Sequence, residues 1–166
     1  GASRSAYIEI QADEYGNGRP GRSHAELFAT TMRSLGLDDR YGAYLDVVPA
    51  TTLATTNFLS MLALQRRWLP AVIGHLAAFE MTSVVPMSRY AAACRRHGLG
   101  DDASEFYDVH VEADEHHGPL ARDEMVSRFV VEHPRSAPLV VWGAAALTAV
   151  ERRFSTHLLD AWSSGR

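Results

Sequence analysis

The segment from Phe106 to His117 constrains the fold of this 166-residue chain more than any other part of the sequence. It contains His110, Asp114 and His117, at spacings of four and three. On an α-helix, where each residue turns by about 100°, these side chains fall within a sector of about 60°. Two imidazoles and a carboxylate on one stripe are suited to iron, manganese or zinc at an open, reactive site. The spacing therefore predicts a helix that turns a metal-competent stripe toward one side.

The hydrophobic pattern is helical nearly throughout, and strand signals are weak. Ser23 is placed to cap a helix. Pro86 and the Gly118-Pro119 pair are expected to stop helices. A short segment spans residues 39–47. The stretch 51–85 forms either two helices or one helix broken at Pro70. The expected helices cover residues 5–15, 23–36, 51–67, 70–85, 88–97, 101–117, 120–132 and 137–162. We therefore predict an all-α bundle that forms one domain over residues 1–166.

Composition narrows the class of function. The net charge of -4 and the pI near 6.0 argue against a nucleic-acid partner, because phosphate binding requires a basic face. All sixteen basic residues are Arg, which is typical of a GC-rich bacterial genome. The longest apolar run, 137–150, is too short to span a bilayer, and there is no apolar signal core at the N-terminus. We expect a cytoplasmic protein with no membrane partner, in which the single cysteine, Cys94, is a packed residue rather than a nucleophile.

Further metal-competent side chains lie outside the stripe. Glu80 stands in the mostly apolar string His75-Leu-Ala-Ala-Phe-Glu80-Met-Thr, and a buried carboxylate is costly unless it is paired or binds a cation. Glu14 and His24 bracket a Gly-rich loop. Helix bundles build di-metal sites from inward-facing carboxylates and imidazoles on several helices. Together with the stripe, these residues predict a mixed carboxylate and imidazole cage.

Three strings carry a resemblance to a known family: DEYGNGRPGRSHAELF at 13–28, GHLAAFEMTS at 74–83 and VHVEADEHH at 109–117. They resemble the iron-containing redox enzymes of the heme-oxygenase-like diiron oxidase superfamily, and the resemblance covers almost the whole chain. It implies an all-helical, heme-oxygenase-like bundle that binds two Fe(II) ions without heme. It also implies that O2 is the cosubstrate in the oxidation of a small molecule.

The resemblance assigns roles residue by residue. Glu14, His24 and His110 would bind one iron, Glu80 would bridge the irons or bind beside them, and the second iron would be served by Asp114 and His117. The catalytic roles fall to Glu80 and His110. The family has a further Glu ligand on a helix upstream of the segment that begins at Asp13. We therefore expect the chain to be a C-terminal portion of the domain, lacking the first helix or helices, with an incomplete second iron site.

The resulting hypothesis is a non-heme diiron oxidase or oxygenase acting on an amino-acid-like substrate, by N-oxygenation, desaturation or C–C cleavage. An external electron donor would serve repeated turnover, and a homodimer is compatible with the sequence. One alternative is an enzyme with a Cys nucleophile or without a cofactor, as in related folds. Others are a non-catalytic or metal-free helical module, and a mono-metal site on Glu14, His24 and His110.

Each candidate also has a purely structural interpretation. Asp114 alone would be a solvated helix acid, and a lone His110 or His117 would be a packed, hydrogen-bonded histidine. Glu14 would be a helix-end acid, His24 a first-turn histidine, and Glu80 the partner of Arg66 or Arg89. His116 points about 100° away from His117 on a helix and is expected at the surface. His75 is expected in the core or behind the ligands.

Overall fold

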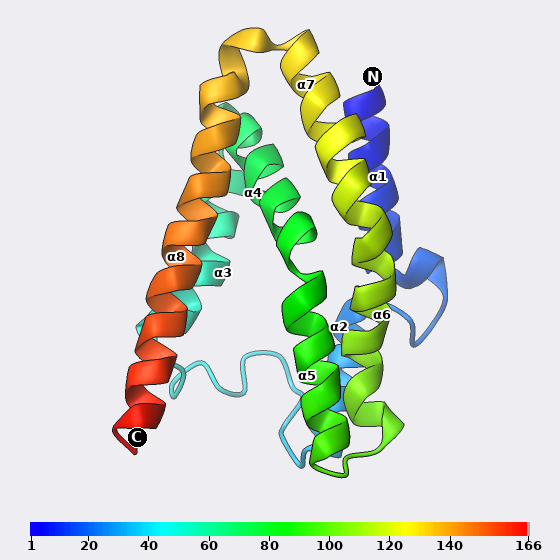
Figure 1. The fold of residues 1–166 in the computed structure, drawn as a ribbon, viewed down its shortest axis with the longest axis vertical. Coiled ribbons are helices and arrows are strands. Elements are labelled where there is room, and N and C mark those ends of the chain that lie inside the picture. Colours follow the sequence, from blue (N-terminus) through cyan, green and yellow to red (C-terminus); the bar gives the residue numbers. More distant parts are fainter. Residues whose placement is uncertain (166) are drawn as a thin grey trace. The chain divides into compact units, whose positions relative to one another are not determined.

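The computed structural model describes residues 1–165, which are helical with connecting turns and contain no β-strand (Figure 1). The all-α class predicted from the sequence is confirmed. The chain divides into two compact units, of which the first joins Gly1–Ala43 to Glu80–Arg128. The second joins Tyr44–Phe79 to the chain from Phe129 onward. That residues 1–166 form one domain stays a prediction.

The first unit is built around a pair of long neighbouring helices, α5 and α6 (Figure 1). α2 packs on α6, and α1 lies along the π-helical segment that follows α6. The elements of this unit are α1 (Ala2–Glu14), η1 (Gly16–Gly18), α2 (His24–Ser34), α5 (Val84–Arg96), α6 (Asp101–Pro119) and the π-helix η3 (Leu120–Val126). The last residues of α4 (Leu69–Thr82) also belong to it. Cys94 is buried here with its thiol 3.5 Å from the carbonyl oxygen of Ala103, which confirms the prediction of a packed residue.

Ser23 caps α2, as predicted from the sequence, and the structure shows that the cap is a capping box with Glu26. The Ser23 hydroxyl accepts the backbone N–H of Glu26 at 3.3 Å, and the Glu26 carboxylate accepts the backbone N–H of Ser23 at 3.2 Å. Two otherwise unpaired helix-end donors are satisfied in this way. The cap makes His24 the first helical residue, and its side chain is buried.

Two prolines that were expected to stop helices do not. Pro86 lies in the first turn of α5, where a missing N–H costs nothing because that group has no intrahelical partner. Pro119 ends α6, but the helix continues into the π-helix Leu120–Val126 and then into α7 (Ser127–Glu132). A proline removes one intrahelical hydrogen bond and crowds the turn before it, but Pro119 keeps helical angles (φ -58°, ψ -43°), so the chain continues as a helix. π-helical turns are frequent at functional sites, and this one begins three residues after His117.

The second unit pairs α3 (Ala50–Ala63) with α8 (Ala137–Ser163), and it contains α4 as far as Phe79. The short 3-10 helices η2 (Arg66–Trp68) and η4 (Pro134–Ser136) join its longer elements. α3 ends at Ala63, and the chain breaks there rather than at Pro70. Pro70 is the second residue of α4. Its core contains Leu62, Ala71 and Val72, with Phe58 and Trp68 packed against them.

Glycines let α4 and α8 approach each other closely within this unit. A Cβ atom on Gly74 would lie 1.8 Å from the carbonyl oxygen of Val140. A Cβ atom on Gly143 would lie 2.1 Å from the carbonyl oxygen of Ala71. Neither distance is compatible with a side chain, so the backbones themselves form this contact.

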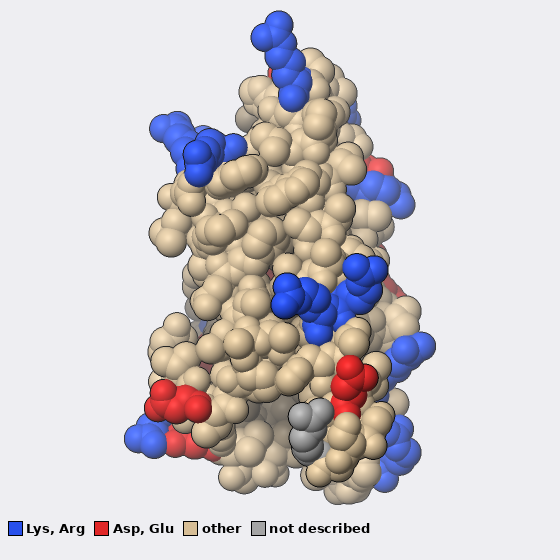
Figure 2. Space-filling view, turned by 90° about the vertical axis from the view of Figure 1, so that its left-hand side faces the viewer, with Lys and Arg blue, Asp and Glu red and all other residues tan. Residues whose placement is uncertain are grey.

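The surface in Figure 2 carries its Arg side chains in small separate groups, with uncharged residues between them. Of the helices within residues 1–165, none is on its own both long and apolar enough to cross a membrane. Two consecutive segments, Arg66–Thr82 and Val84–Arg96, are long and apolar enough to span a membrane only when they are counted together, and the chain bends between them.

Candidate metal centre

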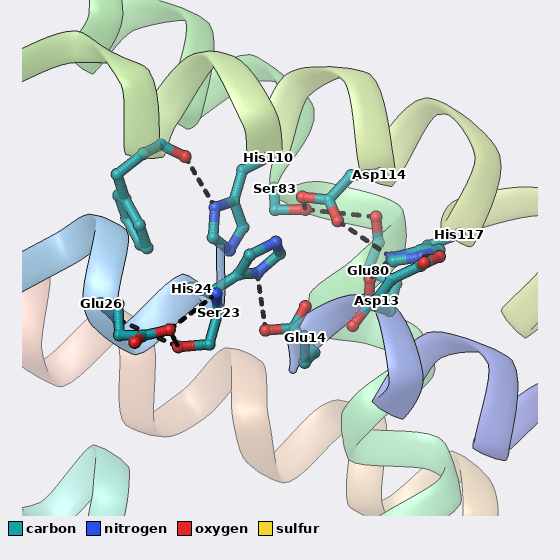
Figure 3. Close-up of polar contacts among 11 residues, drawn as sticks. Asp13, Glu14, Ser23, His24, Glu26, Glu80, Ser83, His110, Asp114 and His117 are labelled. Atoms are coloured by element: carbon teal, nitrogen blue, oxygen red, sulfur yellow. Dashed lines mark hydrogen bonds and ion pairs between the residues drawn. The ribbon is translucent and has the colours of Figure 1, made fainter. Parts of the chain in front are cut away.

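One group of metal-competent side chains consists of Glu14, His24 and His110, from the end of α1, the start of α2 and the middle of α6 (Figure 3). Their ligand atoms all lie within 4.8 Å of one another. Nδ1 of His24 is 2.7 Å from Oε2 of Glu14, and the ring centroids of His24 and His110 are 4.0 Å apart. The structure thus brings together three residues that are separated by up to 96 positions in the sequence (110 − 14).

The backbone fixes the orientation of the His110 ring. Its Nδ1 lies 2.8 Å from the carbonyl oxygen of Phe106, and because a carbonyl only accepts, Nδ1 carries the hydrogen. The other ring nitrogen, Nε2, is then the one with a lone pair for a metal. Burial lowers the pKa of His110, so the imidazole is held neutral, which is the form that binds metals.

A second group consists of Glu14, Glu80 and His117, again with ligand atoms within 4.8 Å of one another. His117 is completely buried, and its Nδ1 lies 3.2 Å from Oε2 of Glu80 and 3.7 Å from Oδ1 of Asp114. Asp114 belongs to neither group of three but lies beside this one, and Ser83 donates its hydroxyl to Oδ2 of Asp114 at 2.5 Å. Glu14 is the residue that the two groups share, so its carboxylate stands between them (Figure 3).

The second group concentrates negative charge in a buried place. Burial raises the pKa of Glu80, and the neighbouring Asp114 carboxylate adds to this effect. Burial alone would lower the pKa of His117, but Asp114, Glu80 and Asp13 outweigh it and raise the pKa to about 10. Without another cation, a protonated imidazole is thus the positive charge among three carboxylates. A bound metal ion would supply that charge instead and would leave the imidazole neutral.

The donor atoms fit a metal better than they fit one another. Five buried side-chain nitrogen or oxygen atoms among the described residues have no hydrogen-bond partner. Three of the five belong to the two groups: Nδ1 of His24, Oε2 of Glu80 and Nδ1 of His117. Each of these atoms lies close to another candidate metal-ligand atom but does not form a hydrogen bond with it, as is typical of side chains that converge on a metal ion. Buried polar atoms normally find partners, so this concentration points to a cation, and imidazole with carboxylate is a ligand set that suits iron.

The loop between α1 and α2 holds Glu14 and His24 in place. Gly16 is buried with φ +63°, and a Cβ atom there would lie 2.4 Å from the carbonyl carbon of Arg22. This close approach leaves no room for a side chain, and the positive φ also favours glycine. Asn17 also has positive φ, and its amide donates to Oδ1 of Asp13 at 2.6 Å. The Gly-rich string that the sequence marks as a loop is therefore a tight turn that sets the spacing of two candidate ligands.

The residues expected to stand outside the centre do so. His116 is exposed and pairs with Glu9 at 3.0 Å, and His75 is buried among aromatic rings. Glu80 contacts His117, and neither Arg66 nor Arg89 forms an ion pair with it in the described part of the chain. Sequence reasoning missed Asp13 and Ser83, which hold His117 and Asp114. Asp13 was missed because it adjoins Glu14, which was already assigned as a ligand. Neighbouring residues on a helix point about 100° apart, so the two carboxylates can contact different partners.

Fold and site together define an all-helical protein with two overlapping groups of carboxylate and imidazole ligands. The profile of a family described as iron-containing redox enzymes matches residues 1–152. The chain therefore belongs to the iron-containing redox enzyme family, and its fold is the heme-oxygenase-like bundle predicted from the sequence.

A curated relative is the nitrosourea synthase of Streptomyces achromogenes subsp. streptozoticus. It is 28% identical to this chain over 134 residues, which cover 80% of the chain. The same segment covers 28% of the relative, so the chain spans less than a third of the length of that protein.

Proposed function

We propose that this protein is a non-heme diiron oxidase or oxygenase that uses O2 to oxidise a small molecule. The observation that carries the proposal is the position of Glu14, whose carboxylate belongs to both groups of candidate ligand atoms that lie within 4.8 Å of one another. A carboxylate shared by two ligand groups is the arrangement that holds two metal ions side by side in helical bundles. Membership of the iron-containing redox enzyme family supports iron as the metal.

The candidate ligands divide into two sets, one for each iron. His24 and His110, with Glu14, would hold one iron, and Glu80 and His117, with Glu14 and the adjacent Asp114, would hold the other. Bound iron supplies O2 activation and the exchange of electrons with the substrate. The protein keeps the ligand atoms converged: the Phe106 carbonyl fixes the ring of His110, and Ser83 fixes one oxygen of Asp114.

Aromatic side chains form an apolar wall beside the histidines. The ring of Phe106 lies 4.3 Å from that of His110 and 4.9 Å from that of Phe28, measured between centroids. Such a wall limits the access of water, which protects reactive species and strengthens electrostatic interactions at the ligands.

A surface cleft of about 260 Å³ leads to the carboxylates of Glu80 and Asp114. Gly118, Pro119 and Arg122 also line it. We place the approach of a small substrate at this cleft, since the candidate ligand Glu80 and the adjacent Asp114 line it. The relative named nitrosourea synthase makes, by its name, a nitrosourea. Oxidation of nitrogen in an amino-acid-like substrate is therefore the reaction that we favour over desaturation or C–C cleavage.

An anaerobic Fe(II) titration of the purified chain, followed by exposure to O2, tests the proposal. We expect two irons per chain, consumption of O2 and a change in visible absorbance. H110A should weaken binding at the first group and E80A at the second, each by at least the roughly 10–100-fold that changes behind metal ligands cause. H116A is the matched control, because His116 adjoins His117 but is exposed and paired with Glu9.

The alternatives predict different outcomes. One iron per chain that is lost in H110A but kept in E80A would favour a mono-metal site on Glu14, His24 and His110. Two irons without O2 consumption would favour a non-catalytic metal-binding module. No iron above background would contradict the proposal.

A further inference from the structure

The hydrogen bond between Asp13 and His117 joins α1 to α6 next to the second ligand group. Oδ2 of Asp13 lies 2.9 Å from Nε2 of His117 (Figure 3). The opposite ring nitrogen, Nδ1, faces Glu80 and Asp114 and has no hydrogen-bond partner among the described residues. His117 is wholly buried, whereas the Asp13 side chain is 34% exposed, so Asp13 reaches the ring from the rim of the site.

Asp13 is itself held from its other side. Its Oδ1 accepts the side-chain amide of Asn17 at 2.6 Å, and Asn17 lies in the tight turn that follows Glu14. One carboxylate thus connects three parts of the centre: the turn between α1 and α2, the end of α1 that carries Glu14, and the His117 ring on α6. Because each oxygen of Asp13 has its own partner, the carboxylate has one preferred orientation.

We infer that Asp13 is a positioning residue that orients His117 for metal binding through Nδ1. Carboxylates that accept the second N–H of a metal-bound histidine fix its tautomer and raise its basicity as a ligand. With Nε2–H directed at Asp13, the lone pair of Nδ1 points at the space shared with Glu80 and Asp114. Asp13 would not touch the metal, since its nearest contact to the site is the far side of the ring. The inference rests on the proposed function, because it requires a metal in the second ligand group.

The same two helices offer a matched control. Glu9 lies one turn before Asp13 on α1, and its Oε1 is 3.0 Å from Nε2 of His116, which is the neighbour of His117 on α6. The pair has the same chemistry and joins the same elements, but both side chains are more than half exposed and neither belongs to a ligand group. E9A therefore removes a carboxylate–histidine contact between α1 and α6 without changing the site.

The test compares the Fe(II) affinity of wild type, D13A, D13S and E9A under anaerobic conditions. We expect D13A to weaken binding of one of the two irons by about 10–100-fold while the other binds as in wild type. D13S, whose hydroxyl is too short to reach the ring, should behave in the same way and serves if D13A does not fold. D13N retains an acceptor for His117 and should recover part of the loss. E9A should match wild type.

A spectroscopic readout separates orientation from general stability. The near-infrared circular dichroism of Fe(II)-loaded protein reports the ligand geometry of each iron, and we expect the bands of one iron to shift in D13A and none to shift in E9A. Wild-type affinity and bands in D13A and D13S, or equal losses in D13A and E9A, would overturn the inference. If the wild type bound no iron, the proposed function itself would fail. If the wild type bound two irons and the Asp13 variants matched it, only the role of Asp13 would be refuted.

Discussion

Glu151 on α8 has a carboxylate that is partly removed from water, and burial raises its pKa above the ordinary value of 4.5. The folded state therefore holds a proton more tightly than the unfolded chain does. This contribution to stability is complete below pH 4.5 and is lost as the pH rises through the folded-state pKa. At neutral pH the ionised Glu151 consequently destabilises the fold.

We expect E151Q to unfold at a higher urea concentration than wild type at about pH 7, and this difference to shrink at about pH 4. Gln replaces the carboxylate with a neutral group of the same shape, so the variant has no charge to bury. E132Q, at the exposed end of α7, is the control for the loss of one negative charge. An unchanged or lower midpoint for E151Q at about pH 7 would contradict the argument.

At the residue scale, the sequence identifies ligand types and spacings but not the contacts behind them. The three-residue stripe on α6 follows from helical geometry alone, whereas the sharing of Glu14 by two groups depends on where three helices meet. The family resemblance placed Glu80 between or beside the irons and left Glu14 at one of them. In the structure, Glu14 belongs to both groups of ligand atoms, and the tight turn at Gly16 lies just after it at the end of α1.

At the scale of single elements, the contact between α4 and α8 depends on the absence of side chains. We expect G74A and G143A each to destabilise the protein by about 1–3 kcal/mol or more, because the added methyl groups would overlap backbone atoms and force the helices apart. G118A is the control for alanine in a helix, since its Cβ atom would lie 3.6 Å from the nearest neighbouring atom. Higher helix propensity should make G118A neutral or stabilising by up to about 1 kcal/mol.

Chemical denaturation of the metal-free variants measures these differences. Equal effects of G74A and G118A would mean that α4 and α8 can separate at little cost in free energy.

The close approach of α4 and α8 explains why sequence patterns located these helices but not their packing. Gly74 and Gly143 weaken helix propensity, and nothing in the sequence states which glycine faces another backbone.

Helix boundaries were predicted best where a side chain makes the boundary. Ser23 and Glu26 cap α2 through local hydrogen bonds, so the start of α2 was predictable from four consecutive residues. The prolines were misjudged because their effect depends on position. Pro86 falls in a first turn, and Pro119 keeps helical backbone angles, so that the π-helix follows it directly. The latter outcome keeps His117 within a continuous helical run from Asp101 to Glu132.

At the scale of the whole molecule, the candidate ligands are distributed unevenly. All six belong to the unit formed by Gly1–Ala43 and Glu80–Arg128, while the other unit contributes none. A ligand that binds only the folded state stabilises it by about 2.7 kcal/mol at a concentration 100 times its dissociation constant. Bound metal should therefore stabilise one unit directly.

We expect Fe(II) under anaerobic conditions to slow amide hydrogen exchange chiefly in segments 1–43 and 80–128, with the largest effect around Glu14, His24 and residues 106–117. Local opening of the ligand-bearing helices must release the metal, so its binding energy adds to the cost of opening there. Segments 44–79 and 129–165 should change less, and E80A should reduce the protection around His117. Mass spectrometry of exchanged, digested protein measures each segment. Protection that is spread equally over both units, or confined to the unit without candidate ligands, would show that the metal binds elsewhere. Hydrogen exchange slows where the metal raises the free energy of local opening, so it reports the position of the binding site.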